Sequence, residues 1–181
     1  MMKPLDRMGD RERAVIEERS ATGYAVAELT HFAEHEDVLR ALLDQLLPGV
    51  PANIDLVAFV DSHTGQAMGR GDRPPGVPAE PELFAAGLAA LADTGFAEWA
   101  DDEQRLLIGR MRRGEADDEL GVAAKDFVDR LLDKSLAGYL AHPDTWIRIG
   151  FTGPAYPEGY AWIGPAEVVA RHRKAAGWDK L

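Results

Sequence analysis

The residues best suited to chemistry lie in one short run, His31-Phe32-Ala33-Glu34-His35. The run matches H-x-x-E-H, the pattern of the inverted zinc metallopeptidases. In a helix, His31 and His35 share one face, where they can ligate zinc while Glu34 activates a metal-bound water. Such a site also needs a third ligand from a distant element. The alternative is the polar first turn of a helix whose buried face begins at Phe32.

Other chemical patterns are weaker. His63 is typical of a polar helix face, and His142 of a helix C-terminus, where the helix dipole favours a cation. Two pairs of adjacent acids are typical of helix starts and turns: Asp101-Asp102 and Asp117-Asp118. The chain has no G-x-S-x-G, no phosphate-binding loop and no strand–G-x-G-x-x-G–helix arrangement. A nucleotide cofactor bound by this chain alone is therefore not expected.

Composition excludes several classes of protein. The 181 residues, 46% hydrophobic and 28% charged, suit one globular domain with arms. A net charge of −11 disfavours nucleic acid and anionic membranes as partners. With no cysteine, disulfides, thiolate metal sites and cysteine nucleophiles are excluded. No uncharged apolar run approaches the roughly 18 residues of a membrane span, and no signal peptide is recognisable, so we expect a cytoplasmic protein.

Apolar residues recur at helical spacing through residues 29–142 and predict a helical core domain. Five helices are expected: from Thr30 as N-cap to the stop at Pro48-Gly49, from after Pro51 to about residue 69, from Pro81 to Gly95, from Asp101 or Asp102 as N-cap to about Met111, and from about Ala123 to His142. The last helix is expected to bury Phe127, Val128, Leu131, Leu132, Leu136 and Tyr139.

Three segments flank this core. Residues 1–28 are charge-rich and predict a solvated arm or a short exposed helix. Residues 143–164 show no helical period, and TWIRIGF (145–151) is the only alternating run in the chain. Residues 165–181 predict a short helix and tail. The fold class is therefore mostly α, a compact helical bundle with a long irregular Pro/Gly/aromatic arm and a short C-terminal helix.

The arm combines rings and other apolar side chains with a backbone that cannot be regular. Its run GPAYPEGYAWIGP carries Tyr156, Tyr160 and Trp162, and Ile147 and Ile149 precede it. Rings left in water waste apolar area, so the segment is not expected to be a plain linker. Residue chemistry leaves two readings open. The arm either folds back on its own bundle or forms a contact surface for a partner.

Six runs in order, covering roughly residues 29–164, resemble the gluconate 2-dehydrogenase subunit 3 family. They are LTHFAEHEDVLRALLDQLLPG, VAFVD, GLAAL, FAEWADDEQRLLIG, DFVDRLLDKSLAGYLAHP and IGFTGPAYPEGYAWIG. The most specific is GPAYPEGY followed by a Trp and a Gly. Members are small subunits of flavin-dependent dehydrogenases whose large subunit belongs to the glucose–methanol–choline oxidoreductase group.

The resemblance implies a partner rather than an activity. It implies that a large subunit holds FAD and the catalytic residues, often passing electrons to a cytochrome, while this chain packs on it and supports its folding and stability. This chain is then a non-catalytic accessory subunit of a sugar or polyol dehydrogenase, with no cofactor, metal or catalytic residue of its own. Many relatives carry a twin-arginine export signal, and this sequence shows none, which favours an intracellular heterodimer.

Under this resemblance, the surface that meets the flavoprotein is expected in the arm. The residues concerned are Trp146, Phe151, Tyr156, Pro157, Gly159, Tyr160 and Trp162. Two rival hypotheses remain. One is a stand-alone zinc-dependent hydrolase that uses His31, Glu34 and His35. The other is a helical interaction module unrelated to redox chemistry.

Overall fold

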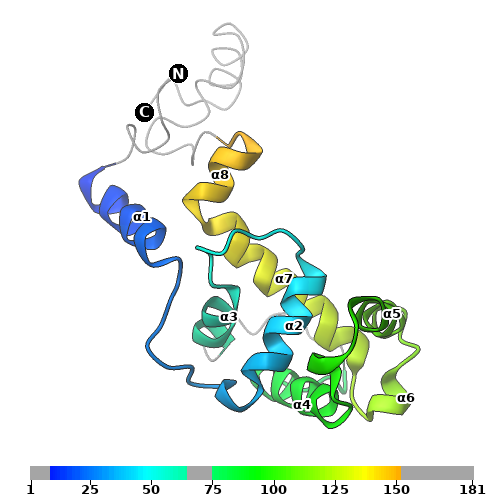
Figure 1. Cartoon of the computed structure of the whole chain (residues 1–181). Helices are drawn as coiled ribbons and strands as arrows, with labels where there is room; N and C mark the ends of the chain where they lie inside the picture. Colours follow the sequence, from blue (N-terminus) through cyan, green and yellow to red (C-terminus); the bar gives the residue numbers. More distant parts are fainter. Residues whose placement is uncertain (1–8, 65–74, 152–181) are drawn as a thin grey trace, which may run out of the picture.

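The computed structural model describes residues 9–64 and 75–151, and all regular structure in these residues is helical (Figure 1). The predicted mostly α fold is therefore confirmed. The elements are α1 (Asp10–Thr22), η2 (Ala33–His35), α2 (Glu36–Leu46), α3 (Leu56–Thr64), α4 (Glu80–Asp93), η3 (Phe96–Glu98), α5 (Asp101–Arg112), α6 (Asp117–Leu120), α7 (Ala124–Ala141) and α8 (Pro143–Ile149). The arm residues 152–164 and the predicted C-terminal helix lie outside the described residues.

Helix α7 is the centre of the bundle. It packs against α3, α4, α5 and α8, while α2 crosses it and packs against α3, α4 and α5. Figure 1 shows α1 beside α8 at one end of the molecule and α4, α5 and α6 at the other. Elements from the two ends of the described chain therefore meet at the same place.

The main core is one apolar cluster in which phenylalanine rings contact one another. The Phe84 ring contacts Phe127 edge-on at 5.9 Å and Phe32 at 6.2 Å between centroids. Gly87 of α4 makes room for this packing, because a Cβ there would lie 2.5 Å from the Phe127 ring. The residues expected to face inward on α4, Leu83, Phe84, Leu88 and Leu91, are all buried.

Helix α7 buries a face slightly different from the expected one. Phe127, Val128 and Leu131 are buried, but Leu136 is 37% exposed, so its predicted inward orientation is wrong. Gly138 is buried in its place, because the Phe59 ring of α3 packs directly on its backbone. A small residue thus marks a close contact between two helices, and hydrophobic periodicity does not predict it.

We expect Gly138→Ala to destabilise the fold. The new Cβ would lie 2.5 Å from the Phe59 ring, and such overpacking exceeds the gain in helix propensity by about 1 kcal/mol. Gly109→Ala in α5 is the matched control, because its Cβ meets only the flexible Arg113 guanidinium at 3.3 Å. In urea denaturation, the free energy of unfolding should fall for Gly138→Ala and rise for Gly109→Ala relative to the wild type. Equal stabilisation by both would contradict the packing of Phe59 on Gly138.

Two helix starts differ from the sequence expectation. The first core helix begins at Glu36, preceded by η2, so Thr30 is not its N-cap. The N-cap of α5 is Ala100, whose backbone N–H donates to the Glu103 carboxylate at 3.2 Å. Asp101 and Asp102 instead lie in the first turn, where acidic side chains interact favourably with the helix dipole.

The chain is also helical where irregular structure was expected. Pro143–Ile149 forms α8, so the prediction of an irregular arm from residue 143 is wrong for this stretch, and the alternating run TWIRIGF is not a strand. Pro143 occupies the first turn of α8, where its missing N–H costs no hydrogen bond. Of the two readings offered for residues 1–28, the short helix is found, as α1.

Candidate functional site

The structure does not provide the geometry that the H-x-x-E-H pattern requires. His31 lies in a bend before η2, and His35 is the last residue of η2, so the two imidazoles do not share an α-helical face. In residues 9–64 and 75–151, no three His, Asp or Glu side chains are grouped so that they could hold a metal ion. The predicted shared helix face of His31 and His35 is therefore wrong, and the zinc-hydrolase hypothesis itself stays a prediction.

Asp61 of α3 binds the backbone of this non-helical segment. Its carboxylate is 1% exposed and accepts hydrogen bonds from the backbone N–H groups of Thr30, His31 and Phe32 at 2.7, 2.7 and 2.8 Å. The Thr30 hydroxyl donates a fourth, at 2.8 Å. One carboxylate thus satisfies three consecutive backbone donors of the bend before η2.

Asp61 is ionised in this setting. Burial raises the pKa of its carboxyl, but the hydrogen bonds from Thr30, His31 and Phe32 together lower the pKa below its ordinary value. The His31 imidazole remains at the edge, with Nδ1 2.9 Å from the Thr30 hydroxyl and 3.9 Å from Asp61. Sequence analysis missed Asp61, although one acid within the apolar run of a buried helix face was a usable signal.

A second polar cluster lies where α1 meets α8, and we call it the α1–α8 junction (Arg19, Tyr24, His142 and Trp146). Three of its side chains donate to backbone carbonyls in the last turn of α7: Arg19 to Ala141 at 2.9 Å, Tyr24 to Gly138 at 3.0 Å, and Trp146 to Leu140 at 2.6 Å. These carbonyls have no partner within the helix. The junction therefore caps the C-terminus of α7.

Tyr24 adopts a strained backbone conformation in this junction. Its φ of 71° is left-handed, which is unusual for a bulky residue. Its ring contacts Phe59 at 4.9 Å and His142 at 5.8 Å, both edge-on. Burial raises the pKa of Tyr24 more than the nearby Arg19 lowers it, so the hydroxyl keeps its proton and can donate.

Gly23, directly before Tyr24, fixes where α1 ends. Its φ is 56°, and a Cβ would lie 1.8 Å from the Asn53 carbonyl oxygen, so no other residue fits without moving the backbone. The Gly23 carbonyl in turn accepts from the Asp55 N–H at 2.7 Å. Asn53 donates to the Asp144 carboxylate of α8 at 2.6 Å. The loop before α3 thus binds both α1 and α8.

His142 is the C-cap residue of α7, so the helix C-terminus that the sequence suggested for it is found. It is fully buried and caps the N-terminus of α8, with Nδ1 accepting from the Asp144 N–H at 3.2 Å. Its Nε2 is buried without a hydrogen-bond partner of normal geometry, although the Arg19 backbone lies near enough to raise the pKa somewhat. Burial is the larger effect and lowers the pKa of His142. The expected cationic role is therefore wrong.

The residues predicted to contact a partner differ in their exposure to solvent. Trp146 is only 8% exposed and packs on Ile16 of α1, so it is a packing residue of this chain. Phe151 is 41% exposed and contacts the Trp146 ring edge-on at 5.5 Å. The remaining predicted residues, Tyr156, Pro157, Gly159, Tyr160 and Trp162, lie outside the described residues.

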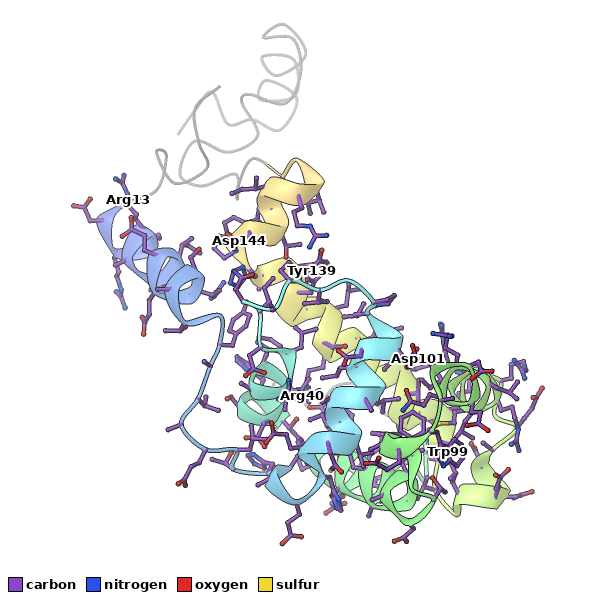
Figure 2. The ribbon with its side chains drawn as sticks, viewed as in Figure 1. Arg13, Arg40, Trp99, Asp101, Tyr139 and Asp144 are labelled. Carbon is purple, nitrogen blue, oxygen red and sulfur yellow. The ribbon has the colours of Figure 1, made fainter. Side chains whose placement is uncertain are left out.

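Around Phe151, α8 presents further apolar side chains to solvent. Ile147 is 73% exposed and Ile149 is 56% exposed. We call these three residues, Ile147, Ile149 and Phe151, the α8 apolar surface. Figure 2 shows Asp144 of α8 at the α1 end of the molecule, far from Trp99 and Asp101 at the α5 end. The surface directly precedes the run of rings at 153–164.

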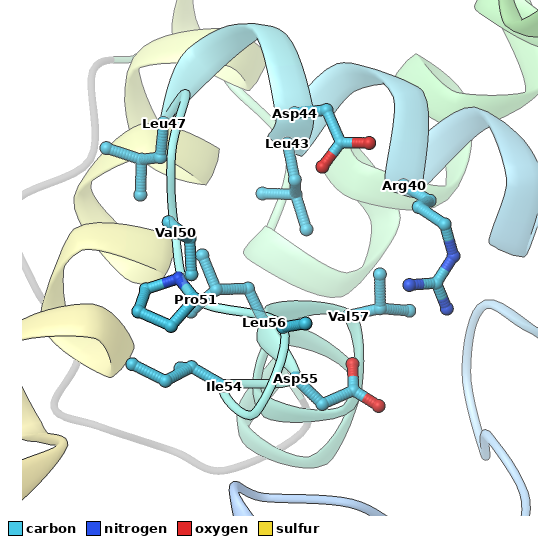
Figure 3. A pocket seen from close by; sticks show the side chains of 11 residues that line it. Arg40, Leu43, Asp44, Leu47, Val50, Pro51, Ile54, Asp55, Leu56 and Val57 are labelled. Carbon is cyan, nitrogen blue, oxygen red and sulfur yellow. The ribbon is translucent and has the colours of Figure 1, made fainter. Parts of the chain in front are cut away.

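A pocket of about 250 Å³ lies between α2 and the start of α3 (Figure 3). Leu43, Leu47 and Val50 contribute apolar lining, and Arg40 and Asp44 lie on the α2 side. The Arg40 guanidinium already pairs with Glu36 one turn earlier, at 2.7 Å. The volume is below the range of about 300–1,000 Å³ that is usual for small-molecule sites, so the pocket does not define a substrate class.

Comparison with protein-family models, curated proteins and solved structures finds no match for this chain. In the part of the chain that the structure describes, no helix is long and apolar enough to cross a membrane. The chain is thus characterised by its own geometry, a helical bundle with an exposed apolar surface at the α8 end.

Proposed function

We propose that this chain is the non-catalytic small subunit of a flavin-dependent dehydrogenase. In this proposal it binds and stabilises a larger, FAD-containing subunit of the glucose–methanol–choline type that oxidises a sugar or polyol. The large subunit carries the flavin and the reaction, and this chain contributes no catalytic residue. The proposal includes a cytoplasmic heterodimer, which subcellular fractionation would check.

The α8 apolar surface is the observation that carries the proposal. Exposed isoleucine side chains with a neighbouring exposed phenylalanine leave apolar area in water that a partner could bury. The surface continues in sequence into the Tyr- and Trp-containing run whose resemblance to the gluconate 2-dehydrogenase subunit 3 family is the most specific. Rings of this kind are enriched where interfaces concentrate their binding free energy.

The junction supports the same proposal in a second way. Ile147 and Ile149 are presented by a helix of seven residues, which alone would not be stable. The Trp146, His142 and Asn53 contacts fix this short helix on the bundle. A surface on a rigid support loses less conformational entropy on binding than a flexible one does.

The test is mild affinity purification of the tagged chain from its native cells, followed by an absorbance scan and mass identification. We expect one larger protein in stoichiometric amount, a flavin spectrum, and an interface that buries upward of about 2,000 Å². A partner without flavin would indicate the helical interaction module unrelated to redox chemistry. A colourless chain that elutes alone would contradict both readings.

A further inference from the structure

We propose that His142 is a pH-sensitive latch for the α8 apolar surface: a proton on its buried imidazole releases α8 from α1 and α7. The release of α8 concerns this chain alone. Only the consequence, weaker binding of the flavoprotein in acid, rests on the proposed function.

The hydrogen bonds of His142 admit one protonation state. Nδ1 accepts from the Asp144 N–H, so it must carry no proton. The neutral ring therefore bears its proton on Nε2, which is fully buried and has no normal hydrogen-bond acceptor. A second proton would turn Nδ1 into a donor facing the Asp144 N–H. The cap of α8 would then be lost, and two N–H groups would point at one another.

The charges around His142 do not favour a cation. The guanidinium of Arg19, from α1, lies close enough to oppose a second positive charge, and the N-terminus of α8 adds its positive dipole. In the part of the chain that the structure describes, the opposing charge that acts on the ring is the Asp144 carboxylate of α8, which is already bonded to Asn53. Tyr24 presents only a ring edge.

Helix α7 ends directly before His142, and the C-terminus of a helix usually attracts a cation. Here its terminal carbonyls are already hydrogen-bonded by Arg19, Tyr24 and Trp146. Among the described residues, the charged groups that shift the pKa of His142 are Asp144 and Arg19, and neither belongs to α7. Protonation therefore places a new charge in a closed site whose acceptors are occupied.

The direction of the pH effect follows from linkage. The pKa of His142 is lower in the folded chain than its unfolded value of about 6.5. Below about pH 6.5 the released state binds the extra proton and the docked state does not, so docking weakens as the pH falls. Above that pH His142 is neutral in both states, and its contribution to the docking of α8 is complete.

The first experiment uses the full isolated chain and NMR between pH 7.5 and 5. It follows the His142 ring signals together with the hydrogen-exchange protection of the Trp146 indole N–H, which donates to Leu140. We expect the indole to lose protection as His142 gains its proton. The Trp99 indole, bonded to Thr94 at 3.2 Å near α5, is the internal control and should not change with it. Protonated His142 with an unchanged Trp146 indole would overturn the latch.

Two variants separate His142 from other titrating groups. His142→Asn keeps a side-chain oxygen that can accept from the Asp144 N–H but cannot titrate in this range, so its Trp146 protection should not depend on pH. His63→Asn, which changes a half-buried imidazole stacked on Phe59 at 4.1 Å, should leave the pH response intact. If both variants abolish the pH response equally, a group other than His142 causes it. If His142→Asn fails to fold, the wild-type titration still decides.

The second experiment measures affinity for the co-purified flavoprotein at pH 7.5 and 5.5. We expect roughly a tenfold loss in acid for the wild type and a smaller loss for His142→Asn. Equal losses in both would overturn the latch as a regulator of docking. If no flavoprotein binds at either pH while the Trp146 signal responds to protonation, the proposed function fails and the latch stands.

Discussion

Asp61→Ala is expected to destabilise the chain by about 3 kcal/mol, because it removes the acceptor of several buried or partly buried donors at once. The Thr30, His31 and Phe32 N–H groups and the Thr30 hydroxyl all lose their partner. Phe32, which is 2% exposed and packs into the core, is held in position by this carboxylate. Chemical denaturation followed by circular dichroism measures the effect.

Matched variants identify the cause. Asp61→Asn keeps an acceptor oxygen but loses the charge, so its effect should fall between that of the wild type and that of Asp61→Ala. Asp44→Ala changes an exposed acid of α2 and should cost less than about 0.5 kcal/mol. If Asp61→Ala is no more harmful than Asp44→Ala, the carboxylate does not hold the segment before η2.

The free energy of unfolding in acid should also show the contribution of Asp61. Because the folded pKa of Asp61 is lowered, its contribution is complete above the unfolded value of about 3.9 and is lost as the pH falls through the folded value. This window lies below the one expected for His142. The free energy of unfolding of Asp61→Ala should therefore fall less steeply than that of the wild type below about pH 4.

Ile147→Asp is expected to weaken binding of the proposed flavoprotein by roughly 100-fold while the chain stays folded. Ile147 is 73% exposed, so the fold does not depend on its side chain. In a complex, the introduced carboxylate would be removed from water without a partner, which is costly. Titration of the purified large subunit with each variant measures the change.

The control places the same charge on another exposed apolar residue. Leu106 of α5 is 67% exposed and lies on a different helix. Leu106→Asp should therefore leave the affinity unchanged, and circular dichroism should show both variants to be helical. Equal affinity for Ile147→Asp and the wild type would remove the α8 apolar surface from the proposed interface. A loss with Leu106→Asp alone would move the interface to α5.

Helices with a full apolar stripe were predictable from sequence. For α4, Pro81 at the start, Gly95 just past the end and four inward residues agree with the structure. For α7, the start near Ala123 and the end at His142 agree as well. The apolar residues of a helix face, and the residues that begin or end the helix, lie within a few positions of one another in the sequence. A local pattern is therefore enough to predict such a helix.

The α8 region shows why the candidate site was only partly predictable. Ile147, Ile149 and Phe151 were recognisable as apolar residues of the arm, but nothing local distinguished them from Trp146, which the structure buries on Ile16 of α1. These two residues are far apart in the sequence. Which apolar side chain faces a partner is therefore decided by how its neighbours pack.

By itself, the sequence determined the helical class, the absence of any cysteine chemistry, the buried face of α4 and the ends of α7, because composition and short-range periodicity are local properties. Only the tertiary structure decided that Asp61 would bind the backbone of the segment before η2, and that the His142 ring would be buried and cap the N-terminus of α8. The first outcome depends on backbone donors from a segment distant in sequence, and the second on the burial of the His142 ring against Tyr24 from the other end of the described chain. Once buried, a polar group must find a partner, and this requirement exceeds local propensity.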